Sequence, residues 1–176
     1  TCADYETAKS AFSAGANMLT HFYNAMTPLK HREPGVVGAA FEHKNLYTQL
    51  ICDFIHVHPA ALRIAIEEMG KDHVIAITDA ISGTGLGDGT YSLGGLEIFV
   101  KDGVCRIAQG NLAGSTLTLD TALRNLLSMG YSIADCVGFL SKNPARALGL
   151  HQKGTIAEGF DADLVVLNDA MQVQMT

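Results

Sequence analysis

Apolar and polar residues alternate along the chain in blocks that predict strands and helices in turn. Tyr47–Asp53 and His73–Thr78 are short apolar runs, typical of buried strands, and Ala16–Phe22 predicts a third strand that ends in polar residues. Between them, Ala60–Met69 has helical periodicity, and Pro59 suits its first turn because no N–H is needed there. This pattern favours a parallel α/β sheet, either open and doubly wound or a (β/α)8 barrel.

The remaining blocks add helices, loops and a hairpin. Asp4–Phe12 predicts a helix, and Ser115–Met129 predicts the clearest one because its leucines form one stripe. Thr27–Gly38 is predicted to be a loop, the glycine-rich Gly83–Gly95 a mobile loop or lid, and Lys101–Gly103 a hairpin turn. Two short helices and then strands follow, at Ile133–Leu140, Pro144–Leu148, Gly154–Gly159, Ala162–Asn168 and from Gln172. A full barrel takes about 250 residues, so the chain is expected to be truncated at both ends.

Composition favours a folded, soluble, cytoplasmic protein, and it leaves a small anionic ligand possible through one or two placed cations. The chain has 176 residues, of which 48% are hydrophobic, and a formal net charge of -6 without a basic cluster, so nucleic acid is a poor partner. No apolar run is long enough to span a membrane, and no signal core follows Thr1. Four cysteines form no CxxC motif and are predicted to be reduced, mostly buried thiols.

Polar residues follow each of the three predicted strands, at the edge where sites of α/β folds assemble. His21 lies at the C-terminal end of the first, and imidazole is the commonest protein ligand of zinc or iron. Asp79 follows the third, where it would be desolvated unless a cation or donor held it; it could instead cap a helix or anchor a loop. His56 and His58 follow the second and alternate, so on extended backbone they would point to opposite faces and not bind one ion.

Two loop segments could recognise an anion. Arg32 could hold a phosphate with its planar fork, or be a solvated surface residue. The backbone amides of Asn111–Ser115 precede the clearest helix and could bind an anion or a sugar hydroxyl, although Ser115 is more simply explained as the N-cap. The other histidines are predicted to lie at the surface: His31, His43, His73 and His151.

Several motifs in order carry a resemblance to a known family. They are THFYNAM with REPG following, DFIHVHP, ITDA, LAGST, NPARALG and KGTIAEGFDADLVVL. Over essentially its whole length the chain resembles the C-terminal half of N-acetylglucosamine-6-phosphate deacetylases, of the amidohydrolase superfamily. The resemblance implies a distorted (β/α)8 barrel, with residues 1–151 as its C-terminal portion. Residues 152–176 would contribute to a small β-domain built from both chain ends.

The resemblance also assigns roles to single residues. It implies that His21 binds the catalytic divalent metal, zinc or iron, and that Asp79 is the catalytic aspartate. Arg32 and His56 would bind the sugar phosphate, partly across a homodimer interface. The implied substrate-binding residues in full are Asn24, Ala25, Arg32, His56, Leu112, Ala113 and Gly114. The implied reaction is removal of the acetyl group from N-acetylglucosamine 6-phosphate.

The chain departs from the family in lacking a ligating glutamate and a further histidine, which family members carry upstream of the matched region. Residues 1–176 alone are therefore expected to be inactive and to bind divalent metal weakly, because a catalytic zinc site takes three protein ligands. Two other functions stay open. One is an amidohydrolase acting on a cyclic amide or N-acyl amino acid, and the other is a non-catalytic sugar-phosphate-binding fragment.

Overall fold

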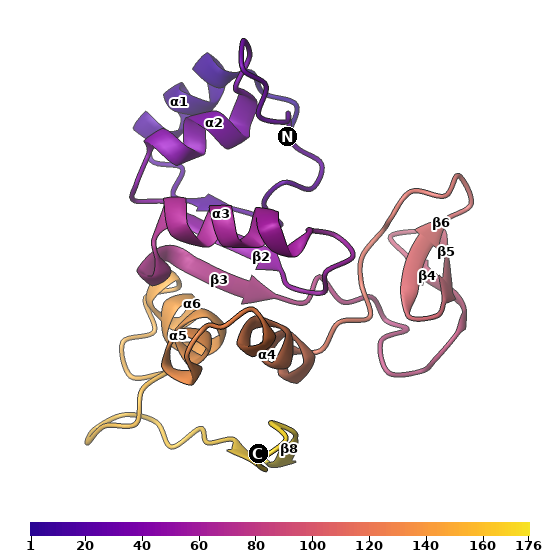
Figure 1. The fold of residues 1–176 in the computed structure, drawn as a ribbon, viewed down its shortest axis with the longest axis vertical. Coiled ribbons are helices and arrows are strands. Elements are labelled where there is room, and N and C mark those ends of the chain that lie inside the picture. The colour runs from indigo at the N-terminus through magenta and orange to yellow at the C-terminus, as the bar shows by residue number, and fades with distance from the viewer.

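A three-stranded parallel sheet forms the centre of the computed structural model, which describes residues 1–176 (Figure 1). The strands β1 (Met18–Leu19), β2 (Tyr47–Ile51) and β3 (Val74–Ile77) are neighbours in chain order. The β2–β3 register runs from Thr48 beside Val74 to Ile51 beside Ile77. The α/β class and the positions of these strands are confirmed.

The strand predicted over Ala16–Phe22 is shorter than expected. β1 ends at Leu19 because His21 and Tyr23 have positive φ, 37° and 74°, which no extended strand allows. Phe22 is nevertheless fully buried, and its N–H donates to the Gln49 carbonyl at 2.7 Å. The chain therefore stays attached to β2 beyond the end of β1.

Helices lie on both sides of this sheet. α1 and α2 pack together at one end of the molecule, α3 lies along β2 and β3, and α4 to α6 lie on the far side of β3 (Figure 1). The helical segments are α1 (Tyr5–Ser13), α2 (Gly35–Glu42), α3 (Pro59–Met69), the 3-10 turn η1 (Lys71–His73), α4 (Leu119–Ser128), α5 (Ile133–Val137), the π-helical η2 (Gly138–Lys142) and α6 (Asn143–Ala147). No helix is long and apolar enough to cross a membrane.

Two helix predictions were wrong at their boundaries. Thr27–Gly38 is not all loop, because α2 begins at Gly35 and buries its residues up to Ala40, which stabilises a helix despite its two glycines. The helix predicted from Ser115 begins only at Leu119. Ser115 is buried and its hydroxyl donates to the Thr78 carbonyl, so it ties the approach to α4 to the end of β3 and is not an N-cap.

A separate antiparallel sheet lies beside the central one, at the right of Figure 1. It consists of β4 (Gly89–Leu93), β5 (Leu96–Lys101) and β6 (Val104–Ile107), with its own small core around Ile98. The hairpin turn at Asp102–Gly103 is confirmed. The glycine-rich segment was predicted to be a loop or lid throughout, and this was wrong for β4, whose backbone pairs fully with β5.

The C-terminal tail is only partly strand. β7 (Val166–Leu167) and β8 (Val173–Met175) form a two-stranded sheet, while Gly154–Gly159, predicted to be a strand, consists of turns and unpaired backbone. Ile156 in that segment is 90% exposed. Within residues 1–176 this side chain has no facing element, and without one an apolar side chain does not order a strand.

The predictions for the thiols held, but those for the surface histidines held only for His31 and His151, since His43 and His73 are half-buried. Cys52, Cys105 and Cys136 are buried and unpaired, and only Cys2 is exposed. His43 is not a surface residue: its ring packs edge-on against Phe12, and its Nδ1 is buried without a partner.

Candidate functional site

Strained backbone follows all three parallel strands. Seven non-glycine residues have positive φ, and five of them lie just after β1, β2 or β3: His21, Tyr23, Ala25, Phe54 and Asp79. Each such residue costs about 1–3 kcal/mol and persists only where the surrounding structure enforces it. This concentration at one sheet edge marks the edge as a candidate site.

His21 has the protonation pattern of a metal ligand. Its Nδ1 lies 3.1 Å from the carbonyl oxygen of Asn24, and the Asn24 N–H donates back to the His21 carbonyl at 2.9 Å. Because a carbonyl oxygen only accepts, Nδ1 carries a proton, and in the neutral ring the lone pair is on Nε2. Histidines that bind metals are oriented in this way by a backbone carbonyl.

The side chains of residues 1–176 could supply some ligands of a metal site, but not a complete set. No group of three His, Cys, Asp or Glu side chains in residues 1–176 is placed to hold one ion. His21 and Asp79 follow strands that are separated by β2. A divalent ion at this edge would therefore take one imidazole, and at most one carboxylate, from these residues.

Asp79 is exposed within residues 1–176, where it was expected to be desolvated unless a cation or donor held it. Its carboxylate accepts no hydrogen bond, and no helix follows directly for it to cap. Its backbone instead anchors the loop: the Ser115 N–H donates to the Asp79 carbonyl at 2.8 Å. The carboxylate is left free to meet a ligand.

The segment Leu112–Gly114 lies beside Asp79, so the structure brings these predicted residues together. Gly114 has φ +65°, and a Cβ there would come within 2.4 Å of the Ile81 side chain and 3.3 Å of the Asp79 carbonyl oxygen. Only glycine fits this approach. The proposed anion site on amides at the start of a helix is wrong, since α4 begins five residues after Gly114.

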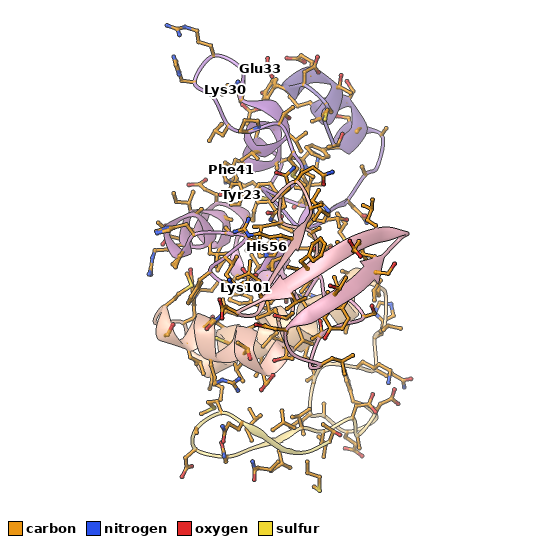
Figure 2. The ribbon with its side chains drawn as sticks, turned by 90° about the vertical axis from the view of Figure 1, so that its right-hand side faces the viewer. Tyr23, Lys30, Glu33, Phe41, His56 and Lys101 are labelled. Atoms are coloured by element: carbon orange, nitrogen blue, oxygen red, sulfur yellow. The ribbon has the colours of Figure 1, made fainter.

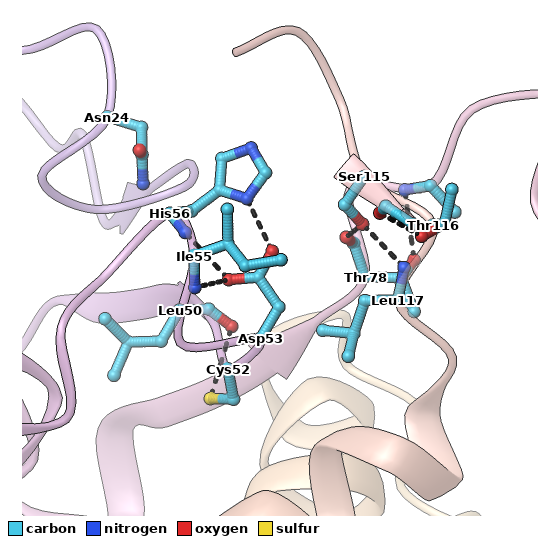
Figure 3. A network of polar contacts seen from close by, with 12 residues as sticks. Asn24, Leu50, Cys52, Asp53, Ile55, His56, Thr78, Ser115, Thr116 and Leu117 are labelled. Atoms are coloured by element: carbon cyan, nitrogen blue, oxygen red, sulfur yellow. Dashed lines mark hydrogen bonds and ion pairs between the residues drawn. The ribbon is translucent and has the colours of Figure 1, made fainter. Parts of the chain in front are cut away.

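His56 is held by a residue that the sequence reasoning did not single out. Its Nδ1 lies 2.6 Å from Asp53 Oδ2, while Asp53 Oδ1 accepts from the backbone N–H groups of Ile55 at 2.9 Å and His56 at 2.8 Å (Figure 3). The two side chains are only 7% and 8% exposed. Burial acts to raise the pKa of Asp53, but the hydrogen bonds from His56 and Ile55 outweigh it and hold that pKa below its ordinary value of 3.8. The Asp-x-x-His spacing was the available signal.

His58 has a separate, structural role. The segment from Asp53 to His58 is bent, with φ 66° at Phe54, so the expectation of extended backbone was wrong. His58 is the N-cap of α3, and its Nδ1 accepts from the Ala60 N–H at 3.2 Å. It therefore faces the helix backbone, while His56 faces Asp53.

The other predicted residues are only partly gathered here. Asn24 lies at the same edge as His56 (Figure 3), and its Nδ2 donates to the Phe22 carbonyl at 3.3 Å. Ala25 is exposed beside it. Arg32 is exposed, forms no ion pair, and belongs to the loop marked by Lys30 and Glu33 in Figure 2, well above His56.

A cavity of about 200 Å³ is lined by Asp53 and His56, by the β5–β6 turn and by residues at and before the start of α4. Asn125, which was not predicted to matter, lines it and donates to the Cys52 carbonyl at 2.8 Å. His56 lines this cavity, whereas His21 and Asp79 do not.

Sequence and structure together place the chain in a class. The model of the Amidohydrolase family matches residues 1–176, so the chain belongs to that family. It is 42% identical over 176 residues to the N-acetylgalactosamine-6-phosphate deacetylase of Escherichia coli O157:H7, covering 99% of this chain and 46% of that protein. It is 39% identical over 178 residues to the N-acetylglucosamine-6-phosphate deacetylase of Bacillus subtilis, covering 100% of this chain and 45% of that protein.

A solved structure has the same fold over the matched region. It is a mutant N-acetyl-D-glucosamine-6-phosphate deacetylase from Mycobacterium smegmatis, in complex with N-acetyl-D-glucosamine-6-phosphate. The TM-score is 0.93 at 39% identity, over 97% of this chain and 46% of the other. The chain thus spans about half the length of the curated relatives it matches.

Replacing Asp53 by Asn should weaken the acid dependence of stability. The folded-state pKa of Asp53 lies below the unfolded value near 3.8, so its charge stabilises the fold above that pH and the contribution is lost as pH falls through the lower folded value. Urea unfolding of the whole protein from pH 3 to 6 measures the slope. Asp53→Asn should reduce the slope of the free energy of unfolding against pH, and the exposed Asp169→Asn should not. Equal slopes in the unmodified protein and both variants would contradict the lowered pKa of Asp53.

Proposed function

We propose that the protein containing this chain is a metal-dependent hydrolase that converts N-acetylglucosamine 6-phosphate to glucosamine 6-phosphate and acetate. The observation that carries the proposal is the placement of His21, His56 and Asp79 after three adjacent parallel strands, in a chain 39% identical to a named deacetylase of this sugar phosphate. Residues 1–151 would be the C-terminal part of a (β/α)8 barrel. Residues 152–176, with β7 and β8, would belong to a small β-domain.

Asp79 is the proposed proton carrier. A divalent metal, zinc or iron, held in part by His21, would supply Lewis-acid activation of the attacking water and the acetyl carbonyl. Asp79 accepts a proton as the water oxygen bonds to the carbonyl carbon. It then donates a proton to the sugar nitrogen as the carbon–nitrogen bond breaks, which yields acetate and the free amine. Its exposed, unpaired carboxylate supports this role.

The phosphate is proposed to lie between His56 and an arginine of a second subunit. His56 is fixed at the site edge, whereas Arg32 is exposed on a loop well away from it (Figure 2). In a homodimer, Arg32 would reach the phosphate bound by the partner subunit. Asn24, Ala25 and Leu112–Gly114 would contact the sugar from the loops after β1 and before α4. We place this reaction in the cytoplasm.

Asp79→Asn in the whole protein should lower kcat about 100-fold to 10,000-fold, the usual contribution of a general acid–base group, with KM little changed. Steady-state release of glucosamine 6-phosphate measures both constants. Asp72→Asn is the matched control, since Asp72 lies at the opposite end of β3 and its side chain is 77% exposed. Near-normal kcat for Asp79→Asn would remove Asp79 from this role.

Arg32→Ala should raise KM for N-acetylglucosamine 6-phosphate about 10-fold or more and leave turnover of unphosphorylated N-acetylglucosamine unchanged, because only the phosphate pairs with a guanidinium. Lys30→Ala on the same loop is the control. Equal losses on both substrates would favour an amidohydrolase of uncharged substrates, such as a cyclic amide. No turnover of either by the unmodified protein would favour the non-catalytic alternative.

One observation favours a second candidate substrate, the C4 epimer, because a relative at 42% identity is named for N-acetylgalactosamine 6-phosphate. We expect kcat/KM to be higher for the gluco sugar. A direct comparison of the two epimers with the unmodified protein decides this, and a preference for the galacto sugar would replace the first substrate by the second.

A further inference from the structure

The Asp53–His56 pair is more tightly defined than any other part of the site edge. Three hydrogen bonds of 2.6–2.9 Å join Asp53 to the ring and backbone of the segment that follows β2. Both side chains are more than nine-tenths buried, so water cannot substitute for either partner. The ring of His56 has one orientation available to it.

The backbone beneath the pair is fixed as well. Asn125 of α4 donates to the carbonyl of Cys52, the residue just before Asp53, at 2.8 Å. Phe54, just after it, has φ 66°, which turns the chain back so that Asp53 can accept from the two backbone N–H groups beyond. Figure 3 shows the carboxylate enclosed by the backbone turn on one side and the imidazole on the other.

The contact also decides where the ring protons are. An ionised carboxylate only accepts, so Nδ1 of His56 must carry a proton to make the 2.6 Å contact. The lowered pKa of Asp53 agrees with an ionised carboxylate. Any second proton on the ring must then be on Nε2, which has no hydrogen-bond partner within the chain and lies on the ring edge away from Asp53.

We propose that Asp53 is a positioning residue: its carboxylate accepts from Nδ1–H, fixes the ring of His56 and stabilises the imidazolium, whose Nε2–H can then donate to an anionic oxygen of the substrate. The proposal rests on the proposed function, in which His56 binds the sugar phosphate. Asp53 itself touches neither sugar nor reacting atoms. It acts by fixing the rotamer that a free histidine would have to adopt on binding, and by placing a negative charge beside the ring that donates to the phosphate.

Asp53→Asn is the informative change, because the amide oxygen can keep both backbone contacts while the amide nitrogen, a donor, faces Nδ1. The neutral ring should then carry its proton on Nε2, and the imidazolium loses its anionic partner, so the phosphate meets an uncharged ring. KM for N-acetylglucosamine 6-phosphate should rise about 10-fold to 100-fold, the effect of losing a hydrogen bond to a charged group, with kcat changed much less. KM for unphosphorylated N-acetylglucosamine should stay the same.

Asp88→Asn is the matched control. Asp88 also accepts from two backbone N–H groups, those of Asp102 at 3.0 Å and Gly103 at 3.4 Å, but it contacts no histidine. Asp88→Asn should leave the ratio of KM for N-acetylglucosamine 6-phosphate to KM for N-acetylglucosamine unchanged. A merely structural role for Asp53 would lower activity on both substrates in step with the free energy of unfolding.

Nitrogen-15 NMR of histidine-labelled whole protein separates this proposal from the proposed function. The unmodified protein should show His56 with Nδ1 protonated, assigned by loss of the signal in His56→Gln, and Asp53→Asn should abolish that state. An unprotonated Nδ1 in the unmodified protein overturns the proposal whether or not the sugar phosphate is turned over. If Nδ1 is protonated but there is no turnover, only the proposed function is overturned. In that case, titration with N-acetylglucosamine 6-phosphate must still shift the Nε2 signal of His56. If it does not, the proposed function and the role of Asp53 are both overturned.

Discussion

The parallel register of β2 between β1 and β3 is the constraint on which the rest of the molecule depends. Leu50 and Ile51 of β2 are fully buried, and both edges of that strand are hydrogen-bonded. Since the three strands run the same way, their carboxyl ends meet at one edge, although they are separated by dozens of residues in sequence. A slip of one residue in the pairing would exchange the two faces of a strand, so the core packing and the alignment of the residues at the carboxyl edge would both be lost.

The strained residues after each strand are held by contacts that bind one strand end to another element. Phe22 is hydrogen-bonded to β2 beyond the end of β1, Ser115 joins the end of β3 to the approach of α4, and Asn125 joins α4 to the end of β2. Each contact uses a buried or half-buried polar group, which is costly to leave unpaired. The core thereby enforces backbone conformations that no local preference would select.

The site edge combines fixed and free side chains, and the difference has a chemical meaning. His21 and His56 each have Nδ1 bonded to a fixed acceptor, so the orientation of each ring is set and Nε2 is left for a ligand. Asp79 has no such partner and lies exposed. Ligand-orienting groups are preorganised, while the group proposed to accept and release protons keeps its carboxylate unpaired.

Much of this could be predicted from the sequence, and the failures have physical causes. Apolar runs located β2 and β3, helical periodicity located α3, and polar residues after the strands identified His21, His56 and Asp79. These features are local, because burial of a strand or of one helix face leaves a pattern within the segment itself. The motifs also determined the family, which the comparison with known proteins confirmed.

Tertiary structure alone decided the rest. The helix α2 depends on burial of a short, glycine-containing run. The late start of α4 depends on the hydrogen bond from Ser115 to the end of β3. Gly154–Gly159 forms no strand because no element of residues 1–176 faces it. Asp53 became significant only when its carboxylate was found against His56. Some contacts join residues that are distant in sequence, and others form around a turn with unusual backbone conformation. Neither kind leaves a periodic pattern in the sequence, so only the folded chain shows which polar groups are paired.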